Sequence, residues 1–393
     1  MGLIWRLATP TTEDHDIKKR CGNEFKWVDY LDKVVSMVFS RHSSAQTLIL
    51  FNDIYTGSNI KDDEHDRRAA KQVNLPNVYP KENDSFPSVA QFKKIMLKSE
   101  NKTRLQKLLK QRFKVRILEK RGEVIYCEGD AAENLTTGLP DQQFVFDQAE
   151  ADTMLLTAYN IIRENGDGRD VVIDSEDSDV CVQAAYVSKK LSGNLLVKNK
   201  NTVLKSKDML SDEVAEIIIA FYELTGSDQN SSFFGKGKKK ILEKVKRDSE
   251  ARKLLFEVGE NLVLHDEVRE KMKKFVLSVI YGENYDSCSK ARASKWRTMK
   301  KKSMARLPPD DDTLNHHCER TNYLTNCLKN FDLRIHPSPI GHGYVNINGR
   351  CRPVRYSKSA LPENLSLTTD TTEVESDESG SEYGESSDDG DED

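Results

Sequence analysis

The sequence predicts an α/β fold: a mixed, mostly parallel sheet flanked by helices, followed by a helical extension and an acidic tail. Short apolar runs rich in Val, Ile and Leu alternate with longer stretches whose apolar residues recur at helical spacing. Several of the short runs end in acidic residues. Because strands that alternate with helices favour parallel or mixed pairing, functional side chains are expected at the carboxyl ends of the strands.

The first elements follow this alternation. Residues 25–41 place four valines and a leucine on one helical face, and 47–51 form an unbroken apolar run typical of a buried strand. Residues 54–87 are polar and contain prolines, which predicts a long loop. The next predicted elements are a helix at 89–113, strands at 115–118, 124–126 and 144–146, a helix at 149–163, a strand at 170–173 and a helix at 180–191.

The later elements complete a predicted core at residues 1–250. Residues 195–197 and 202–204 form a predicted hairpin around an Asn-Lys-Asn turn, and 212–225 is an amphipathic helix followed by a shorter one at 241–246. Beyond the core, changes in composition predict a basic helical extension at 251–306, a proline-rich segment with short strands at 307–365, and a disordered acidic tail at 366–393.

The net charge of −4 conceals a strong asymmetry. Residues 370–393 contain twelve Asp and Glu and no Lys or Arg, so removing these twelve negative charges from the net −4 leaves +8 on the rest of the chain. A basic body with an acidic tail is typical of a nucleic-acid-binding protein. An acidic tail that only increases solubility is an equally good interpretation.

Other features indicate an intracellular protein that does not enter a membrane. No run approaches the roughly 20 apolar residues needed to span a bilayer. Arg6 interrupts the short apolar start, so no secretory signal is expected, and it also occupies the position where a myristoylation motif needs Ser or Thr. The seven cysteines are dispersed without a Cys-x-x-Cys pair, which predicts reduced thiols in the cytosol or nucleus. We expect a monomer.

Six acidic residues at the ends of apolar runs are candidate ligands for two Mg²⁺ or Mn²⁺ ions. These hard cations prefer oxygen ligands, and a pair of them can activate water and neutralise a phosphodiester undergoing hydrolysis. Each acidic pair alone is also typical of a surface loop, but the order of four such segments is more specific. The candidate metal ligands are Asp53, Glu150, Asp152, Asp177, Asp179 and Asp228.

Two basic segments complete the candidate site. Lys61, Arg67 and Arg68 belong either to a solvated helix of mixed charge or to the group that stabilises the scissile phosphate. A glycine- and lysine-rich loop follows Asp228, and glycines allow backbone N–H groups to approach phosphates. Its spacing is not that of a Walker loop. The candidate nucleic-acid-binding residues are Gly235, Lys236, Gly237, Lys238 and Lys239.

Two further patterns have weaker functional interpretations. The basic stretch 290–306, with Trp296 inside it, is either a solvated helix or a patch for nucleic acid or nuclear import. The spacing of the histidines and cysteines near the carboxyl end matches no closed set of zinc ligands. These residues are His316, His317, Cys318, Cys327, His336 and His342.

Taken in order, these segments resemble the flap endonuclease-like branch of the PIN-domain nucleases, and most of all a group of uncharacterised, often transposon-associated animal proteins with this core. The resemblance rests on 51–53 with the basic residues downstream, on 150–152, on 175–179, and on 224–228 running into 233–240. It covers roughly residues 1–365. It implies a PIN-like fold, a metal-dependent nuclease activity on DNA or RNA in the nucleus or cytoplasm, and a helix-two-turn-helix-like element at 224–246 that binds duplex DNA.

One departure from the family keeps an alternative open. In these nucleases the first strand carries an Asp of the metal cluster, whereas here no acid precedes Glu13, as if the front of that strand were missing. The alternative is therefore a degenerate homologue that binds nucleic acid or protein without cutting. A weaker alternative is a metal-dependent phosphatase or transferase that uses Asp177 and Asp179.

Overall fold

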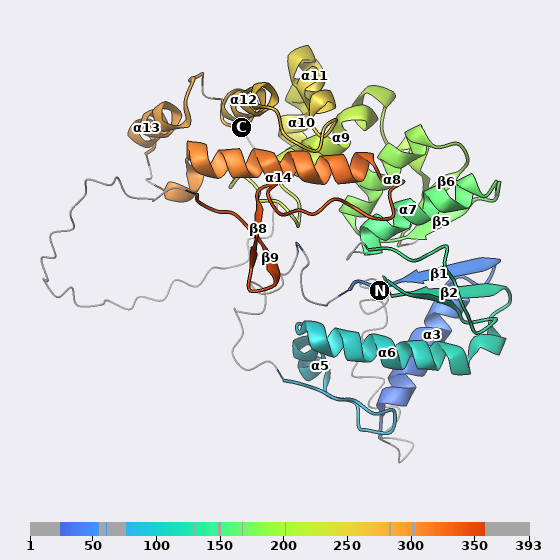
Figure 1. Cartoon of the computed structure of the whole chain (residues 1–393). Helices are drawn as coiled ribbons and strands as arrows, with labels where there is room; N and C mark the ends of the chain where they lie inside the picture. Colours follow the sequence, from blue (N-terminus) through green and yellow to red (C-terminus); the bar gives the residue numbers. More distant parts are fainter. Residues whose placement is uncertain are drawn as a thin grey trace, which may run out of the picture. The chain divides into compact units, whose positions relative to one another are not determined.

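The computed structural model describes residues 24–54, 60, 76–128, 130–147, 151–166, 168–200, 202–282, 284–300 and 303–357. The chain divides into two units, Met1–Ser357 and Lys358–Asp393, and the second lies wholly outside the described residues. Within the described ranges, no helix is long and apolar enough to cross a membrane. The architecture is α/β, with mixed sheets that contain parallel pairs and are flanked by helices (Figure 1).

The first sheet has the strand order β1-β2-β3-β4. β1 (Thr47–Phe51) and β2 (Glu123–Cys127) pair in parallel, with Thr47 beside Glu123 and Phe51 beside Cys127. The pairs of β2 with β3 (Ala132–Asn134) and of β3 with β4 (Leu139–Pro140) are antiparallel. The helices of this region are α3 (Trp27–Arg41), α5 (Val89–Ile95) and α6 (Ser99–Val115).

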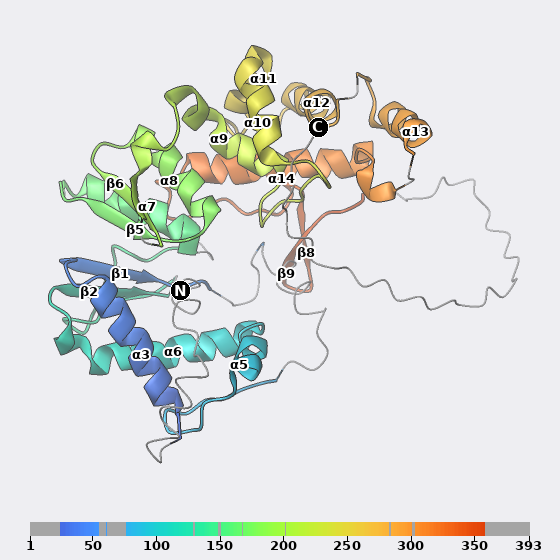
Figure 2. The same ribbon diagram turned by 180° about the vertical axis from the view of Figure 1, so that it is seen from behind.

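Side chains alternate between the two faces of the first sheet, as strand geometry requires. One face packs against α3 and α6, which Figure 2 shows lying together on that side. The opposite face packs against α7 (Ala151–Glu164). The first face presents Leu48, Leu50, Val124 and Tyr126, and the second presents Ile49, Phe51, Ile125 and Cys127.

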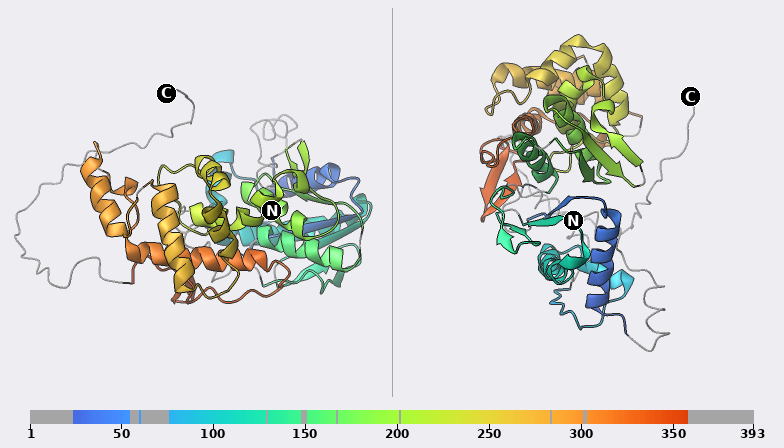
Figure 3. Two further views of the ribbon diagram at one scale, coloured as in Figure 1. Left: turned by 90° about the horizontal axis from the view of Figure 1, so that it is seen from above. Right: turned by 90° about the vertical axis from the view of Figure 1, so that its right-hand side faces the viewer.

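The helix α7 lies between the first sheet and a second one because it is apolar on two sides (Figure 3). Met154 and Ala158 pack on the first sheet, whereas Leu156 and Tyr159 enter the core of the second. The second sheet has the order β5-β6-β7, with the first pair parallel and the second antiparallel. Its elements are β5 (Val171–Asp174), α8 (Ser178–Lys190), β6 (Leu195–Asn199), β7 (Thr202–Lys205), η2 (Ser206–Asp208) and α9 (Asp212–Thr225).

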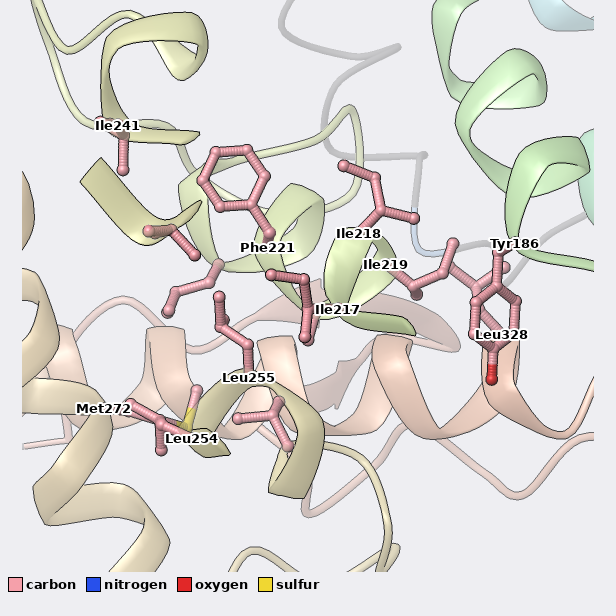
Figure 4. Packing of buried hydrophobic residues seen from close by; sticks show 14 of the residues in the cluster. Tyr186, Ile217, Ile218, Ile219, Phe221, Ile241, Leu254, Leu255, Met272 and Leu328 are labelled. Atoms are coloured by element: carbon pink, nitrogen blue, oxygen red, sulfur yellow. The ribbon is translucent and has the colours of Figure 1, made fainter. Parts of the chain in front are cut away.

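A single hydrophobic core joins the second sheet to the helices that follow it. Figure 4 shows side chains of several helices gathered around Ile217 of α9 and Leu255. The sequence-based boundary at residue 250 therefore falls inside one core. The remaining elements are α10 (Lys238–Arg247), α11 (Ser249–Glu257), α12 (Asp266–Phe275), η3 (Val276–Ile280), α13 (Cys288–Thr298), η4 (Met304–Arg306), α14 (Asp311–Lys329), β8 (Tyr344–Ile347) and β9 (Arg350–Pro353).

The strand predicted at 115–118 is wrong. The helix α6 continues to Val115, and a short 3-10 helix, η1 (Ile117–Glu119), follows it. Arg116 forms ion pairs with Glu119 and Asp32, and these pairs favour a local turn over extended backbone. Leu118 is 96% exposed, so the apolar run that suggested a strand has no sheet to pack on.

Two other predictions are corrected in the same region. The helix predicted at 89–113 is interrupted after Ile95, because the side chain of Asn101 donates a hydrogen bond to the Ile95 carbonyl at 3.0 Å. The strand predicted at 144–146 is irregular chain, although Phe144 and Phe146 are buried. The rings of Phe144 and Phe146 pack in the same hydrophobic cluster as α7, although the chain that carries them pairs with none of the described strands.

The described strands form two mixed sheets and a separate hairpin of β8 and β9 rather than one mostly parallel sheet. Each mixed sheet contains one parallel pair. The two are connected by the packing of α7 and by polar contacts between their ends, such as that of Arg169 Nη1 with Gln46 Oε1 at 2.9 Å.

Candidate functional site

Asp53 follows β1 at a point where buried polar groups fix the backbone. Asn52 is 2% exposed, and its backbone and side-chain nitrogens both donate to the Cys127 carbonyl, at 3.2 and 2.9 Å. The Tyr126 hydroxyl donates to the Gln106 carbonyl at 3.0 Å and lies 3.4 Å from the Asn52 side-chain oxygen. Asn52 therefore prolongs the pairing of β1 with β2 and sets the direction in which Asp53 leaves the sheet.

The carboxylate of Asp53 lies at the N-terminus of α7. Its Oδ1 accepts a hydrogen bond from the Ala151 N–H at 3.0 Å. This position favours a negative charge, because the first N–H groups of a helix have no partner within it and the helix dipole is positive there. The first turn of α7 also contains Asp152, so two of the predicted ligands lie at this end of the helix. Glu150 lies outside the described residues.

Asp177 and Asp179 lie at the start of α8. Asp177 is the N-cap residue, and its Oδ1 accepts the N–H of Asp179 at 3.0 Å. This capping interaction fixes Asp179 in the first turn of the helix. Of the two acids, Asp177 is exposed and Asp179 is partly buried.

Asp174, the last residue of β5, belongs to a separate ion pair. Arg41 and His42, at the carboxyl end of α3, both contact it, with Arg41 Nη2 at 2.8 Å and His42 Nε2 at 3.2 Å. Burial opposes ionisation of Asp174, but the hydrogen bonds from these two residues outweigh it and lower the pKa to about 2. This carboxylate therefore joins β5 to α3 and is not available to a cation.

Lys238, from the predicted nucleic-acid loop, lies among the acids of the predicted metal site. Burial lowers the pKa of Lys238, and the nearby charges of Asp179, Glu223 and Asp228 act in the opposite direction. Its Nζ lies 3.1 Å from the ring centroid of Tyr222, whose hydroxyl donates a hydrogen bond to Asp179. Burial raises the pKa of Tyr222, so this hydroxyl keeps its proton. We refer to Asp179, Tyr222, Glu223, Asp228 and Lys238 as the acid–lysine cluster.

Buried side chains of α14 hold the loop that carries Asp228. Asn230 donates to Thr321 Oγ1 at 2.9 Å and to the Glu223 carbonyl at 3.1 Å, and it accepts from Arg320 Nε at 3.1 Å. Arg320 is 5% exposed and also donates to the Val354 carbonyl at 2.9 Å. The loop, α14 and the end of the β8–β9 hairpin therefore form one polar network.

His317 extends this network to the end of α9. Its Nε2 donates to the Leu224 carbonyl at 2.9 Å, and its Nδ1 accepts from the hydroxyl of Ser231, also at 2.9 Å. A carbonyl can only accept, so Nε2 carries a proton. Burial lowers the pKa of His317 to about 3, so the ring is neutral and its Nδ1 is an acceptor. His317 is thus an anchor of the loop rather than a zinc ligand.

The glycine- and lysine-rich loop begins with a tight turn. The Lys236 N–H donates to the Phe233 carbonyl at 3.1 Å, and Gly235 has φ of 68°. Gly237 then precedes α10 as an N-cap residue that supplies no side-chain hydrogen bond. The first N–H groups of α10 therefore receive no hydrogen bond from an N-cap side chain. Lys239, in the first turn of this helix, is exposed.

The described part of the predicted site forms two groups. One contains Asp53 and Asp152 at the start of α7, and the other is the acid–lysine cluster, next to the Asp177 cap of α8. In the described ranges, no three His, Cys, Asp or Glu side chains form a group that could hold a metal ion. The predicted catalytic residues Lys61, Arg67 and Arg68 lie outside those ranges.

Sequence reasoning missed several residues of this site. Glu223 is 6% exposed, and its position in the otherwise apolar carboxyl half of α9 was an available signal. Tyr222 precedes it and gave no signal of its own. Asn230, His317 and Arg320 could not be assigned because their partners are distant in the sequence.

Comparison with known proteins gives no match: no family model, no curated protein and no solved structure matches the chain.

Proposed function

We propose that the protein is a metal-dependent nuclease that hydrolyses phosphodiester bonds of DNA or RNA. The observation that carries this proposal is that Lys238, from the basic loop, lies over the ring of Tyr222, whose hydroxyl donates a hydrogen bond to Asp179 of the acidic set. The charges of Asp179 and Asp228 also act on the pKa of Lys238. The acidic set is suited to a hard cation, and the basic loop is suited to phosphate. The sequence indicates these two segments separately, and the fold makes them neighbours. The resemblance to flap endonuclease-like nucleases supports the same assignment.

The residues present fit Mg²⁺ or Mn²⁺. Their donors are carboxylate oxygens, which these cations prefer. Neighbouring carboxylates repel one another, and the ammonium of Lys238 offsets part of that repulsion within the acid–lysine cluster. We assign the metal-binding role to Asp53, Glu150, Asp152, Asp177, Asp179 and Asp228.

Divalent ions bound by this set would supply the positive charge that neutralises the phosphate and activates water. The residues of the chain itself do the positioning. Tyr222 holds Asp179 through its hydroxyl, and Asp177 fixes the start of α8. The polar network of α14 anchors the loop that carries Asp228 through Asn230. In this proposal Lys236 and Lys239 attract the nucleic-acid backbone, and Lys61, Arg67 and Arg68 stabilise the scissile phosphate.

Cleavage assays test the proposal directly. The full chain is incubated with flap, nicked and single-stranded substrates in Mg²⁺, in Mn²⁺ and in EDTA. We expect cleavage that requires the divalent ion and that Asp179→Asn abolishes. Glu176→Gln is the matched control, because it removes a carboxylate from the same segment outside the proposed ligand set. Equal cleavage by wild type and Asp179→Asn contradicts the assignment.

One observation favours a second candidate, a nucleic-acid-binding homologue that does not cut. Lys238 already supplies a positive charge that interacts with the charges of Asp179 and Asp228, two of the proposed metal ligands. On this alternative, wild type shows no cleavage with any divalent ion but retains salt-dependent nucleic-acid binding in EDTA. The same assay, with a binding measurement added, therefore separates the two candidates.

A further inference from the structure

The turn at the start of the glycine- and lysine-rich loop presents an aromatic ring to solvent. Phe233 is partly buried, and its ring packs edge-on against Tyr281 at 5.8 Å and tilted against His317 at 5.0 Å, measured between ring centroids. The next residue, Phe234, is 59% exposed. The hydrogen bond from Lys236 to Phe233 closes the turn, so Phe234 stands at its tip on a backbone that is anchored on both sides.

The space beside this ring is open. Gly235 has φ of 68°, a conformation that L side chains rarely adopt, yet a Cβ built on it would meet no atom within 4 Å. The glycine is therefore required by the shape of the turn and not by crowding. It leaves the backbone beside Phe234 accessible to another molecule.

Positive charge surrounds the same turn. Lys236 Nζ lies 4.7 Å from the ring centroid of Tyr281, beneath the turn, and Lys239 and Lys240 are exposed in the first turn of α10. An exposed apolar ring alone is ordinary on a protein surface. An exposed ring on a turn closed by a backbone hydrogen bond and flanked by lysines is a combination that suits unpaired nucleotides, because the ring can stack on a base while the lysines pair with the phosphates.

We propose that this turn binds a single-stranded segment of nucleic acid, with an unpaired base stacked on Phe234 and neighbouring phosphates held by Lys239 and Lys240. This inference rests on the proposed nucleic-acid function and narrows its substrate class to nucleic acid with an unpaired segment. In a duplex the faces of each base are covered by the neighbouring bases. Only an unpaired or terminal base therefore has a free face that can stack on the ring of Phe234.

The test measures binding in EDTA, where cleavage does not contribute. Fluorescence anisotropy of the full chain is followed with a labelled single strand and with a blunt duplex of the same sequence. The variants are Phe234→Ala, the aromatic replacement Phe234→Tyr, and the control Phe256→Ala. Phe256 is also half exposed and has Lys329 Nζ 5.4 Å from its ring centroid, but it belongs to α11.

Phe234→Ala is expected to weaken single-strand binding roughly tenfold without changing its salt dependence, because no charge is lost. Phe234→Tyr and Phe256→Ala should bind like wild type, and duplex binding should be unchanged in every variant. Equal single-strand affinity of wild type and Phe234→Ala, or equal loss for both ligands, overturns the inference while leaving the proposed function standing. If wild type binds neither ligand, this inference and the proposed function both fail.

Discussion

The two regions that carry the proposed site are held by different kinds of interaction. Around the strand that precedes Asp53, aromatic and aliphatic side chains pack on both faces of the first sheet. The loop that carries Asp228 is held instead by buried polar groups of α14, chiefly Arg320, His317 and Thr321. Apolar packing is insensitive to protons, whereas a buried imidazole must stay neutral. The second region should therefore be the one that acid disrupts.

The apolar region should show the largest effect of a single substitution. Trp27 is 2% exposed, and its ring centroid lies 4.6 Å from that of Phe86. Trp27→Ala should lower the free energy of unfolding by about 3–5 kcal/mol, because it leaves a cavity among rings that cannot close it. Denaturant titrations at neutral pH and at about pH 5 should give the same loss. If Trp27→Ala lowers the free energy of unfolding more at about pH 5 than at neutral pH, the apolar region is also sensitive to acid and the two regions do not differ in this respect.

The polar region should lose stability in acid through His317. The pKa of this imidazole is lowered from 6.5 to about 3, so the folded protein binds fewer protons than the unfolded chain. Its contribution is complete above pH 6.5 and disappears as the pH falls toward 3, by up to roughly 5 kcal/mol.

His317→Gln separates this contribution from the rest of acid unfolding. Glutamine cannot titrate, so the variant should be about 2 kcal/mol less stable at neutral pH and should lose less stability on acidification. Denaturant titrations across this pH range give both values. Parallel pH profiles for wild type and His317→Gln would mean that the imidazole does not carry the acid sensitivity.

A substitution at Gly226 tests how tightly the backbone of the loop that carries Asp228 is packed. Its φ is 109°, and an added Cβ would lie 2.5 Å from Ser232 Cα. Gly226→Ala should lower stability by about 3 kcal/mol, because backbone strain and a clash act together. Gly166 is the matched control: its φ is 71°, but a Cβ there meets nothing within 4 Å, so Gly166→Ala should cost only about 1 kcal/mol. Thermal melting of both variants should therefore give clearly different losses.

The smallest of these effects concerns the ion pair that joins β5 to α3. The pKa of Asp174 is lowered from 3.8 to about 2 by Arg41 and His42, against the effect of burial. Its contribution of roughly 2 kcal/mol is complete above pH 3.8 and is lost as the pH falls toward 2. Asp174→Asn should remove this loss between pH 3.8 and 2, a range below the main change due to His317. An unchanged profile in Asp174→Asn would mean that the pair does not stabilise the fold.

The same contrast explains what could be predicted from the sequence. The strand Thr47–Phe51 and the helix Asp212–Thr225 were predicted with the bounds that the structure gives, and the hairpin of β6 and β7 was predicted as antiparallel. Each depends on a local apolar period that sequence displays directly. Placing Asp53 after a buried strand depended on the same kind of signal.

The polar network could not be predicted in this way. Asn322 and Thr325 are buried on α14, although their residue types are typical of a solvated face. His317 has its partner 93 residues away, at Leu224. No local pattern identifies such a partner, so His317 was assigned no role: the spacing of the nearby histidines and cysteines matched no closed set of zinc ligands. Lys238 was predicted as a phosphate-binding residue, and its position among Asp179, Glu223 and Asp228 depends on the fold of the loop.

The central claim is that the two regions hold the same divalent ions, Asp53 from one side and Asp228 from the other. Mn²⁺ binding, followed by electron paramagnetic resonance on the uncleaved full chain, tests it most directly. Wild type is expected to bind Mn²⁺, and Asp53→Asn and Asp228→Asn should each weaken that binding at least about tenfold. If either variant binds Mn²⁺ as wild type does, the two regions do not share a metal site and the account is wrong.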